Sequence, residues 1–524
     1  MFQRLTPAVV FCACVLVFQA EGADWNQWRG PERNGVSAED TKLVDSWRGR
    51  PKELWKSEKV VSEGEGGFSS VTVADGRAYV YVNWEYKVPI ETRRLSKGGL
   101  KRLGWDPKMP ETLLEKMKEA RLSEERAGLD KKKVRGWANE WIKQNMDKKQ
   151  RRWRGIVQRR LIRGRDAIPL DTLRTIDEIT NRQFPTEDDL DAWLDEHEIP
   201  EKVREKVKKH IPTTVTKAHD VFLCFDAQTG ETVWKRQEEG RAYGWPSSST
   251  ACVEGGRVYV LGSNAMVYCL DAGNGAIIWK SRSKANAGTN ASSSFVVSGG
   301  KAIVMGGPLM AFDAESGDLL WSQNQVKAVH NSPVLWEGGG KTRVVCHTGG
   351  RIACVDPADG KVLWSVGGGK GNSSPAIRGD YMAVVGQNKD FGLQAYKLTA
   401  QGPEKLWSVP FHDRGTSPLI YGDHVYAFGR GGNARALCVE LETGEVKWEE
   451  KIPNTEFSSP VGSDGKILAA VGRLLYLVEA DPSEFRVLAR ANVGIARCVS
   501  PALVDGRVYL RLRNNVAAFD LRAK

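Results

Sequence analysis

Eleven polar or aromatic side chains lie at comparable places along the chain, each shortly before a small-polar turn that opens an apolar strand. They are Arg241, Tyr243, Trp245, Asn290, His330, Asn331, Lys370, Asn372, Arg414, Glu456 and Arg497. Cationic and amide groups predominate, and such groups donate hydrogen bonds to carboxylate or sugar oxygens. If the fold brings them together, they predict a site for an anionic or carbohydrate-like ligand. The alternative is a hydrated rim with no special role.

Catalytic patterns are sparse. His330 is a candidate ligand or base, but a single histidine with no visible acidic partner is more often a polar loop residue. The chain has no Gly-x-Ser-x-Gly elbow, no phosphate-binding glycine loop and no His-Glu-x-x-His motif. It also lacks a Cys-x-x-Cys pair and any cysteine–histidine spacing typical of a metal site. The sequence therefore predicts no metal site and assigns no catalytic residue.

The elements that must position these groups are repeats. The segment Phe225–Lys235 carries Trp234 near its end and recurs down the chain at a tryptophan spacing of 41 to 45 residues, which is typical of propellers and solenoids. The tryptophans of the repeat are Trp234, Trp279, Trp321, Trp364, Trp407 and Trp448.

Each unit also has a small-polar turn before its first strand. The eight turns are Ser69-Ser70, Ser248-Ser249, Ser293-Ser294, Ser332-Pro333, Ser374-Pro375, Ser417-Pro418, Ser459-Pro460 and Ser500-Pro501. β-Branched and aromatic runs with glycine turns follow, which predicts four strands per unit. The last unit stops before its tryptophan strand, and an orphan copy of that strand surrounds Trp55. We therefore expect an all-β fold, an eight-bladed β-propeller closed by the N-terminal strand.

These repeats resemble the pyrroloquinoline-quinone-like (PQQ-like) propeller family, over about residues 53–84 and 219–524. The segment Asp24–Pro31 also looks like the start of exported bacterial members. The family includes quinoprotein dehydrogenases and the propeller lipoprotein of the outer-membrane barrel assembly machinery. The resemblance implies that each tryptophan docks on a glycine turn of the neighbouring blade. A WD40 propeller has a similar period, but no unit carries its Trp-Asp signature.

A quinoprotein dehydrogenase would need PQQ, a calcium ion held by oxygen ligands and an aspartate base. Many family enzymes also carry a disulfide between adjacent cysteines, and the mature chain has no adjacent pair. The recurring acids belong to the Asp-x-x-Thr-Gly turns, where they are expected to bond the local backbone. The cysteines before those acids, such as Cys224 and Cys269, share their position with Ala311 and Ala518, which predicts a small buried slot.

The N-terminus predicts export. Residues 1–22 combine Arg4, an apolar core and the small pair Ala20 and Gly22, as in a secretory signal peptide. Lipidation at Cys14 is the alternative. The mature protein is then periplasmic or extracellular, with no transmembrane span expected.

Residues 85–218 break the repeat and predict a basic helical insertion in the first blade. They hold 33 Lys and Arg against 24 Asp and Glu. Apolar residues at helical spacing predict helices over Pro110–Arg121, from about Asp130, around Leu170 and from the cap Thr186. The basic run from Lys148 is either a solvated face or a surface for anionic lipid, envelope polymer or nucleic acid, and export argues against the last.

Three functions remain. The main hypothesis is a non-catalytic binding or scaffold protein of the cell envelope, with an envelope protein, an anionic polymer or a small ligand as partner and no cofactor assigned. The alternatives are a PQQ- and calcium-dependent dehydrogenase of alcohols or sugars, and an outer-membrane protein assembly factor. The predicted domains are 1–22 for the signal peptide, 23–84 with 219–524 for the propeller, and 85–218 for the insertion.

Overall fold

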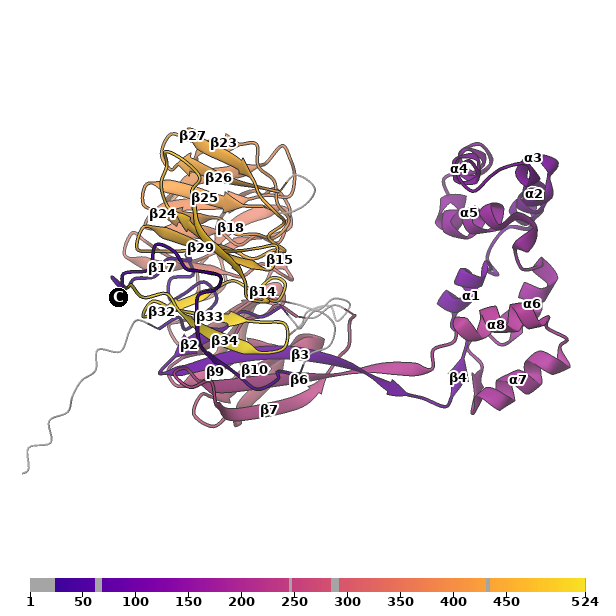
Figure 1. Cartoon of the computed structure of the whole chain (residues 1–524), viewed down its shortest axis with the longest axis horizontal. Helices are drawn as coiled ribbons and strands as arrows, with labels where there is room; N and C mark the ends of the chain where they lie inside the picture. Colours follow the sequence, from indigo (N-terminus) through magenta and orange to yellow (C-terminus); the bar gives the residue numbers. More distant parts are fainter. Residues whose placement is uncertain (1–23, 62–67, 245–246, 284–291, 430–433, 524) are drawn as a thin grey trace, which may run out of the picture. The chain divides into compact units, whose positions relative to one another are not determined.

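The structure is a computed structural model that describes residues 24–61, 68–244, 247–283, 292–429 and 434–523. The predicted signal peptide, Trp245 and Asn290 lie outside the described residues. The chain divides into two compact units, one formed by Met1–Tyr86 with Lys217–Lys524 and the other by Lys87–Thr216. Both are drawn in Figure 1.

The first unit contains eight antiparallel sheets of four strands each, here numbered in chain order of their first strands (Figure 1). In hydrogen-bonded order, sheets 1 to 3 consist of β2 (Thr72–Ala74), β3 (Arg77–Pro89), β6 (Thr214–Asp226) and β7 (Thr232–Gly240); β8 (Cys252–Glu254), β9 (Arg257–Leu261), β10 (Met266–Asp271) and β11 (Ile277–Arg282); and β12 (Val296–Ser298), β13 (Lys301–Met305), β14 (Gly307–Asp313) and β15 (Leu319–Ala328). Sheets 4 to 6 consist of β16 (Val334–Gly338), β17 (Lys341–His347), β18 (Arg351–Val355) and β19 (Val362–Gly367); β20 (Ala376–Arg378), β21 (Tyr381–Val385), β22 (Leu393–Thr399) and β23 (Gly402–Val409); and β24 (Leu419–Tyr421), β25 (His424–Phe428), β26 (Arg435–Glu440) and β27 (Val446–Lys451). Sheets 7 and 8 consist of β28 (Val461–Ser463), β29 (Lys466–Val471), β30 (Leu474–Glu479) and β31 (Val487–Asn492); and β32 (Ala502–Val504), β33 (Arg507–Arg511), β34 (Val516–Asp520) and β1 (Lys52–Lys56).

The first strands of the sheets lie innermost. Strand β2 contacts both β8 and β32, and β20 contacts both β16 and β24. The second and third strands are buried on both faces, as in the run Val258–Leu261, because each sheet packs between two others. The prediction of a mainly β, propeller-type fold is therefore confirmed.

A small residue faces each repeat tryptophan across the strand ladder. Trp234 pairs with Cys224, and Trp321 pairs with Ala311. Cys224 and Ala311 are fully buried, because the indole occupies the space that a larger side chain would need. The cysteines of this slot are thus packing residues, as predicted.

The tryptophans also join neighbouring sheets. The Trp279 indole N–H donates to the Ala314 carbonyl of the next sheet at 3.2 Å, and its ring covers Gly317 in the same turn. Equivalent bonds run from Trp55 to Ala227, Trp234 to Ala272, Trp321 to Pro357, Trp407 to Leu441 and Trp448 to Asp481. Trp364 is the exception among these tryptophans, because its buried indole N–H finds no acceptor in the described part of the chain.

A chain of hydrogen bonds links the turns before the innermost strands. In each, a backbone N–H donates to the hydroxyl of the next sheet, at 2.8 to 3.1 Å. In order, the residues are Ser70, Thr250, Ser294, Ser332, Ser374, Ser417, Ser459 and Ser500, and the Ser500 N–H donates back to the Ser70 hydroxyl. We call this set the hydroxyl cycle. Together with the pairing of β1 and β34, it connects the two ends of the repeat region.

The acids of the turns bond the local backbone, as predicted. The Asp313 carboxylate accepts from the backbone N–H groups of Ser316 and Glu315 at 2.8 and 2.9 Å. These two hydrogen bonds lower the pKa of Asp313, since they stabilise its charged form.

The second unit is helical. Its elements are β4 (Arg93–Arg94), α1 (Lys97–Leu103), α2 (Glu111–Leu122), α3 (Glu124–Ala127), α4 (Val134–Asn145), η1 (Gln150–Trp153), α5 (Arg154–Arg163), η2 (Gly164–Asp166), α6 (Leu170–Glu178), β5 (Gln183–Phe184), α7 (Glu187–Glu196) and α8 (Glu201–Lys209). Thr186 forms the predicted capping box with Asp189 at the start of α7. Within residues 24–523, apart from the segments outside the description, no helix is long and apolar enough to cross a membrane.

Candidate functional site at the centre of the sheets

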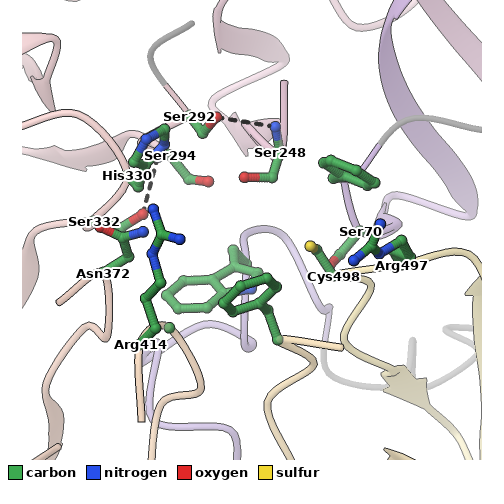
Figure 2. Close-up of a pocket in the computed structure, with 14 residues that line it drawn as sticks. Ser70, Ser248, Ser292, Ser294, His330, Ser332, Asn372, Arg414, Arg497 and Cys498 are labelled. Atoms are coloured by element: carbon green, nitrogen blue, oxygen red, sulfur yellow. Dashed lines mark hydrogen bonds between the residues drawn. The ribbon is translucent and has the colours of Figure 1, made fainter. Parts of the chain in front are cut away.

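A pocket of about 230 Å³ lies where the loops before the innermost strands converge (Figure 2). Its lining residues are Trp28, Phe68, Ser70, Ser248, Ser292, Ser294, His330, Ser332, Asn372, Arg414, Gly415, Phe457, Arg497 and Cys498. Each of the eight sheets contributes at least one of them from the loop before its first strand. The pocket therefore lies on the axis that the hydroxyl cycle surrounds.

The N-terminal segment forms one side of this pocket. Trp25 pairs with Val73 of β2, and Ser37 donates its backbone N–H to Gly462 of β28. Between these two anchors Trp28 reaches the pocket wall. Because the anchors belong to sheets 1 and 7 and further bonds reach sheets 3, 4 and 6, the segment crosses the space between the sheets.

Two buried arginines hold the segment. Arg33 donates to the carbonyls of Ser294 and Pro333, at 3.0 and 3.2 Å, and to that of Phe295. Arg29 donates to the carbonyl of Pro418. Burial, and then the charge of Arg33, lower the pKa of Arg29 to about 9. The guanidinium groups thus satisfy strand-end carbonyls that would otherwise be unpaired inside the protein.

Of the predicted site residues, four line the pocket. These are His330, Asn372, Arg414 and Arg497 (Figure 2). They come from sheets 4, 5, 6 and 8, so they are brought together by the ring of loops and not by sequence proximity.

The other described candidates lie outside the pocket lining. Asn331 is buried and donates its side-chain amide to the carbonyls of Gly371 and Ser373, so it supports the loop before β20. The remaining four are Arg241, Tyr243, Lys370 and Glu456. Arg241 stacks over the Tyr243 ring at 5.1 Å, and Glu456 forms an ion pair with Arg497 at 2.9 Å.

Sequence reasoning missed the hydroxyl and aromatic parts of the lining. Ser70, Ser294 and Ser332 were assigned to repeat turns, and Trp28 to an N-terminal motif. The signal for the serines was present, since a hydroxyl recurs at the same place before each innermost strand. No local signal places Trp28 in the pocket, because its neighbours there are distant in sequence.

The charge in the pocket is carried mainly by Arg414. Arg497 is neutralised by Glu456, whereas no described carboxylate pairs with Arg414. Burial, and then the Arg414 guanidinium, lower the pKa of His330. His330 is consequently neutral at pH 7.

These residues do not fit calcium-bound PQQ. Calcium takes six to eight oxygen ligands, usually including carboxylates, but none of the described lining residues is acidic. In the described ranges no three His, Cys, Asp or Glu side chains form a group that could hold a metal ion. The described lining therefore supplies neither a carboxylate ligand for calcium nor an aspartate base.

Comparison with known proteins identifies the repeat. A family model described as "Outer membrane protein assembly factor BamB" matches residues 218–450. The protein of that name from Yersinia pestis is 25% identical over 273 residues, covering 46% of this chain and 63% of the relative. Over this region the chain is similar to the PQQ-like β-propeller family, which agrees with the resemblance of its repeats. The protein of the same name from Escherichia coli strain K12 is 24% identical over 305 residues, covering 47% of this chain and 76% of the relative.

Among solved structures, the PQQ-like chain is similar to the crystal structure of BamB from Moraxella catarrhalis. The TM-score is 0.46 at 16% identity, and the match covers 58% of this chain and 89% of that one. A likeness at this level adds nothing to the family assignment.

Proposed function

We propose that this PQQ-like propeller is an exported, non-catalytic binding protein of the bacterial envelope that takes part in outer-membrane protein assembly. The observation that carries the proposal is the match of residues 218–450 to a family model with that description. The curated relatives from Yersinia pestis and Escherichia coli carry the same description. Assembly is thereby favoured over a general scaffold role, which was the main hypothesis from the sequence.

The proposed architecture is an eight-bladed propeller with a helical insertion in its first blade. Each four-stranded sheet is one blade, β1 completes the last blade against β34, and the insertion leaves after β3 and returns at β6. The hydroxyl cycle supports eight blades because its eight hydrogen bonds return to Ser70. The helical unit Lys87–Thr216 corresponds to the insertion.

The proposed location is the periplasm or the outside of the cell, with residues 1–22 removed as a signal peptide or processed at Cys14. The support is the leader pattern and the outer-membrane context in the relatives' names. The partners would be envelope proteins rather than nucleic acid.

A binding role also agrees with the chemistry of the pocket. Its described polar groups are hydrogen-bond donors and one neutral imidazole, without a carboxylate to orient His330 as a base. Such a set can hold a ligand in place. The dehydrogenase alternative has no such support, because no described lining residue offers a carboxylate to bind calcium or to act as the base.

Crosslinking in cells would test the assembly role. The tagged full-length protein is crosslinked in its source bacterium, and the captured proteins are identified by mass spectrometry. We expect enrichment of outer-membrane β-barrel proteins or of their assembly components, and a lower amount of folded barrels when the protein is depleted. A tagged, unrelated exported protein is the control. Capture of no envelope protein above that control, with unchanged barrel amounts, would refute the role.

A further inference from the structure

The hydroxyl cycle presents hydrogen-bond donors to the pocket. The hydroxyl oxygens of Ser70, Ser294 and Ser332 each accept a backbone N–H from the preceding residue of the cycle, at 3.0 Å. A serine hydroxyl has one proton to donate, and no described residue accepts it from these three. All three line the pocket and are buried. Their protons are therefore available to an acceptor on the axis.

Three further side chains face the pocket without a partner in the described structure. They are His330, Asn372 and Arg414. Figure 2 shows the Arg414 guanidinium directed toward His330 and the serines of sheets 3 and 4. Convergent, unsatisfied polar groups in a concave site are typical of ligand pockets. A guanidinium that forms no ion pair with a described carboxylate favours an anionic ligand group.

Part of the pocket wall is aromatic. Trp28, Phe68 and Phe457 contribute aromatic rings. Phe457 is held against Gly415, where a Cβ would lie 2.7 Å from the ring. Aromatic faces pack against the apolar face of a ring-shaped ligand. The volume of about 230 Å³ limits that ligand to roughly one ring.

We propose that the pocket binds a hexuronate, a monosaccharide-sized cyclic polyol with one carboxylate. The carboxylate lies at Arg414, and the ring oxygens accept hydrogen bonds from Ser70, Ser294 and Ser332. The aromatic rings cover the apolar face of the sugar. This inference goes beyond the proposed role in assembly, because it concerns a small ligand at the axis and not a protein partner.

Titration calorimetry of the purified mature protein tests the chemistry with three probes. Glucuronate carries both the polyol ring and the carboxylate, glucose lacks the carboxylate, and benzoate lacks the hydroxyls. We expect saturable binding of glucuronate and at least about tenfold weaker binding of the other two, since each loses hydrogen bonds to a charged or buried group. If glucuronate does not bind at millimolar concentrations, or if glucose or benzoate binds equally well, the proposal is wrong.

A matched pair of variants tests the residue assignment. Arg414→Gln should weaken glucuronate binding about tenfold or more. Arg241→Gln removes an exposed arginine from another loop before an innermost strand, outside the pocket lining, and should leave binding unchanged. Both side chains are exposed, so thermal unfolding should match the parent. Equal affinity of Arg414→Gln and the parent protein would overturn the proposal.

The pKa of the His330 imidazole gives a test of binding that does not rely on calorimetry. An anion bound beside Arg414 offsets the charge that helps to lower the pKa of His330, so glucuronate should raise that pKa in an NMR titration. Glucose should leave it unchanged. An unshifted pKa at saturating glucuronate would place the sugar elsewhere and overturn the assignment. None of these measurements depends on the crosslinking result, so failure here and failure of the assembly role are distinguishable.

Discussion

The contact between Trp279 and Gly317 offers a direct measure of how strongly neighbouring sheets are joined. Gly317 has a φ of +78°, and a Cβ placed there would lie 2.5 Å from the indole of Trp279. Gly317→Ala therefore meets two penalties. An alanine in the left-handed region costs about 1 to 2 kcal/mol, and forcing a methyl group into a packed ring costs about 1 to 3 kcal/mol more. We expect the free energy of unfolding to fall by about 2 to 5 kcal/mol.

Gly300→Ala separates the two penalties. Gly300 has a φ of +71°, and a Cβ there meets nothing within 4 Å, so this variant carries the backbone penalty alone. Urea unfolding followed by circular dichroism gives the free energy of unfolding for both variants. The difference between them, about 1 to 3 kcal/mol, measures the collision with the indole. Equal destabilisation of Gly317→Ala and Gly300→Ala would refute the view that the tryptophan contact joins the sheets.

Three further predictions concern buried polar groups. Burial lowers the pKa of His347 from 6.5 to about 4, so the unfolded chain takes up a proton at this side chain before the folded chain does as the pH falls. The free energy of unfolding should therefore drop by about 3 kcal/mol between pH 6.5 and 4. In urea unfolding measured over a pH series, His347→Gln should remove this drop. Arg33→Met removes the hydrogen bonds that Arg33 donates to strand-end carbonyls, which should cost about 3 kcal/mol or more and speed proteolysis of the N-terminal segment. Trp407→Phe loses an indole hydrogen bond of 2.8 Å and should lower the melting temperature more than Trp364→Phe, whose indole N–H has no described acceptor.

For each of these three predictions, one experimental result would contradict the reasoning. A His347→Gln variant with the same pH dependence as the parent would show that another group causes the loss at low pH. Arg50→Met removes an exposed arginine and should leave the free energy of unfolding unchanged. If Arg50→Met lowers that free energy as much as Arg33→Met does, the hydrogen bonds of the buried Arg33 are not what stabilises the protein. Equal melting temperatures for the two tryptophan variants would mean that the indole hydrogen bond contributes nothing measurable.

The β-repeat was predictable because its cause is local and recurs. The tryptophan and the small residue opposite it recur for one packing reason, and the turn acids recur because they bond the local backbone, so periodicity alone reveals strands and turns. Helix α7 was predictable for a similar reason, since Thr186 and Asp189 cap it within one turn.

Helix α1 was not predicted, because its sequence contains Gly98 and Gly99, which favour a loop. The structure explains the choice at Gly99. A Cβ there would lie 2.8 Å from Leu95 and 3.1 Å from the His210 carbonyl. The close approach of these groups requires glycine and compensates for its poor helix propensity, and this tertiary contact leaves no pattern in the local sequence.

The sequence by itself determined the repeat, its mainly β character and the type of polar groups that precede each innermost strand, because side-chain spacing and turn chemistry act over a few residues. Tertiary structure alone decided which of those groups meet. Arg414 and His330 turn toward the axis, Asn331 turns into the adjoining loop, and Trp28 reaches the same pocket from the N-terminal segment. The physical reason is that the pocket is shared by eight separate loops, and the direction of each side chain depends on neighbours that lie tens to hundreds of residues away in the chain.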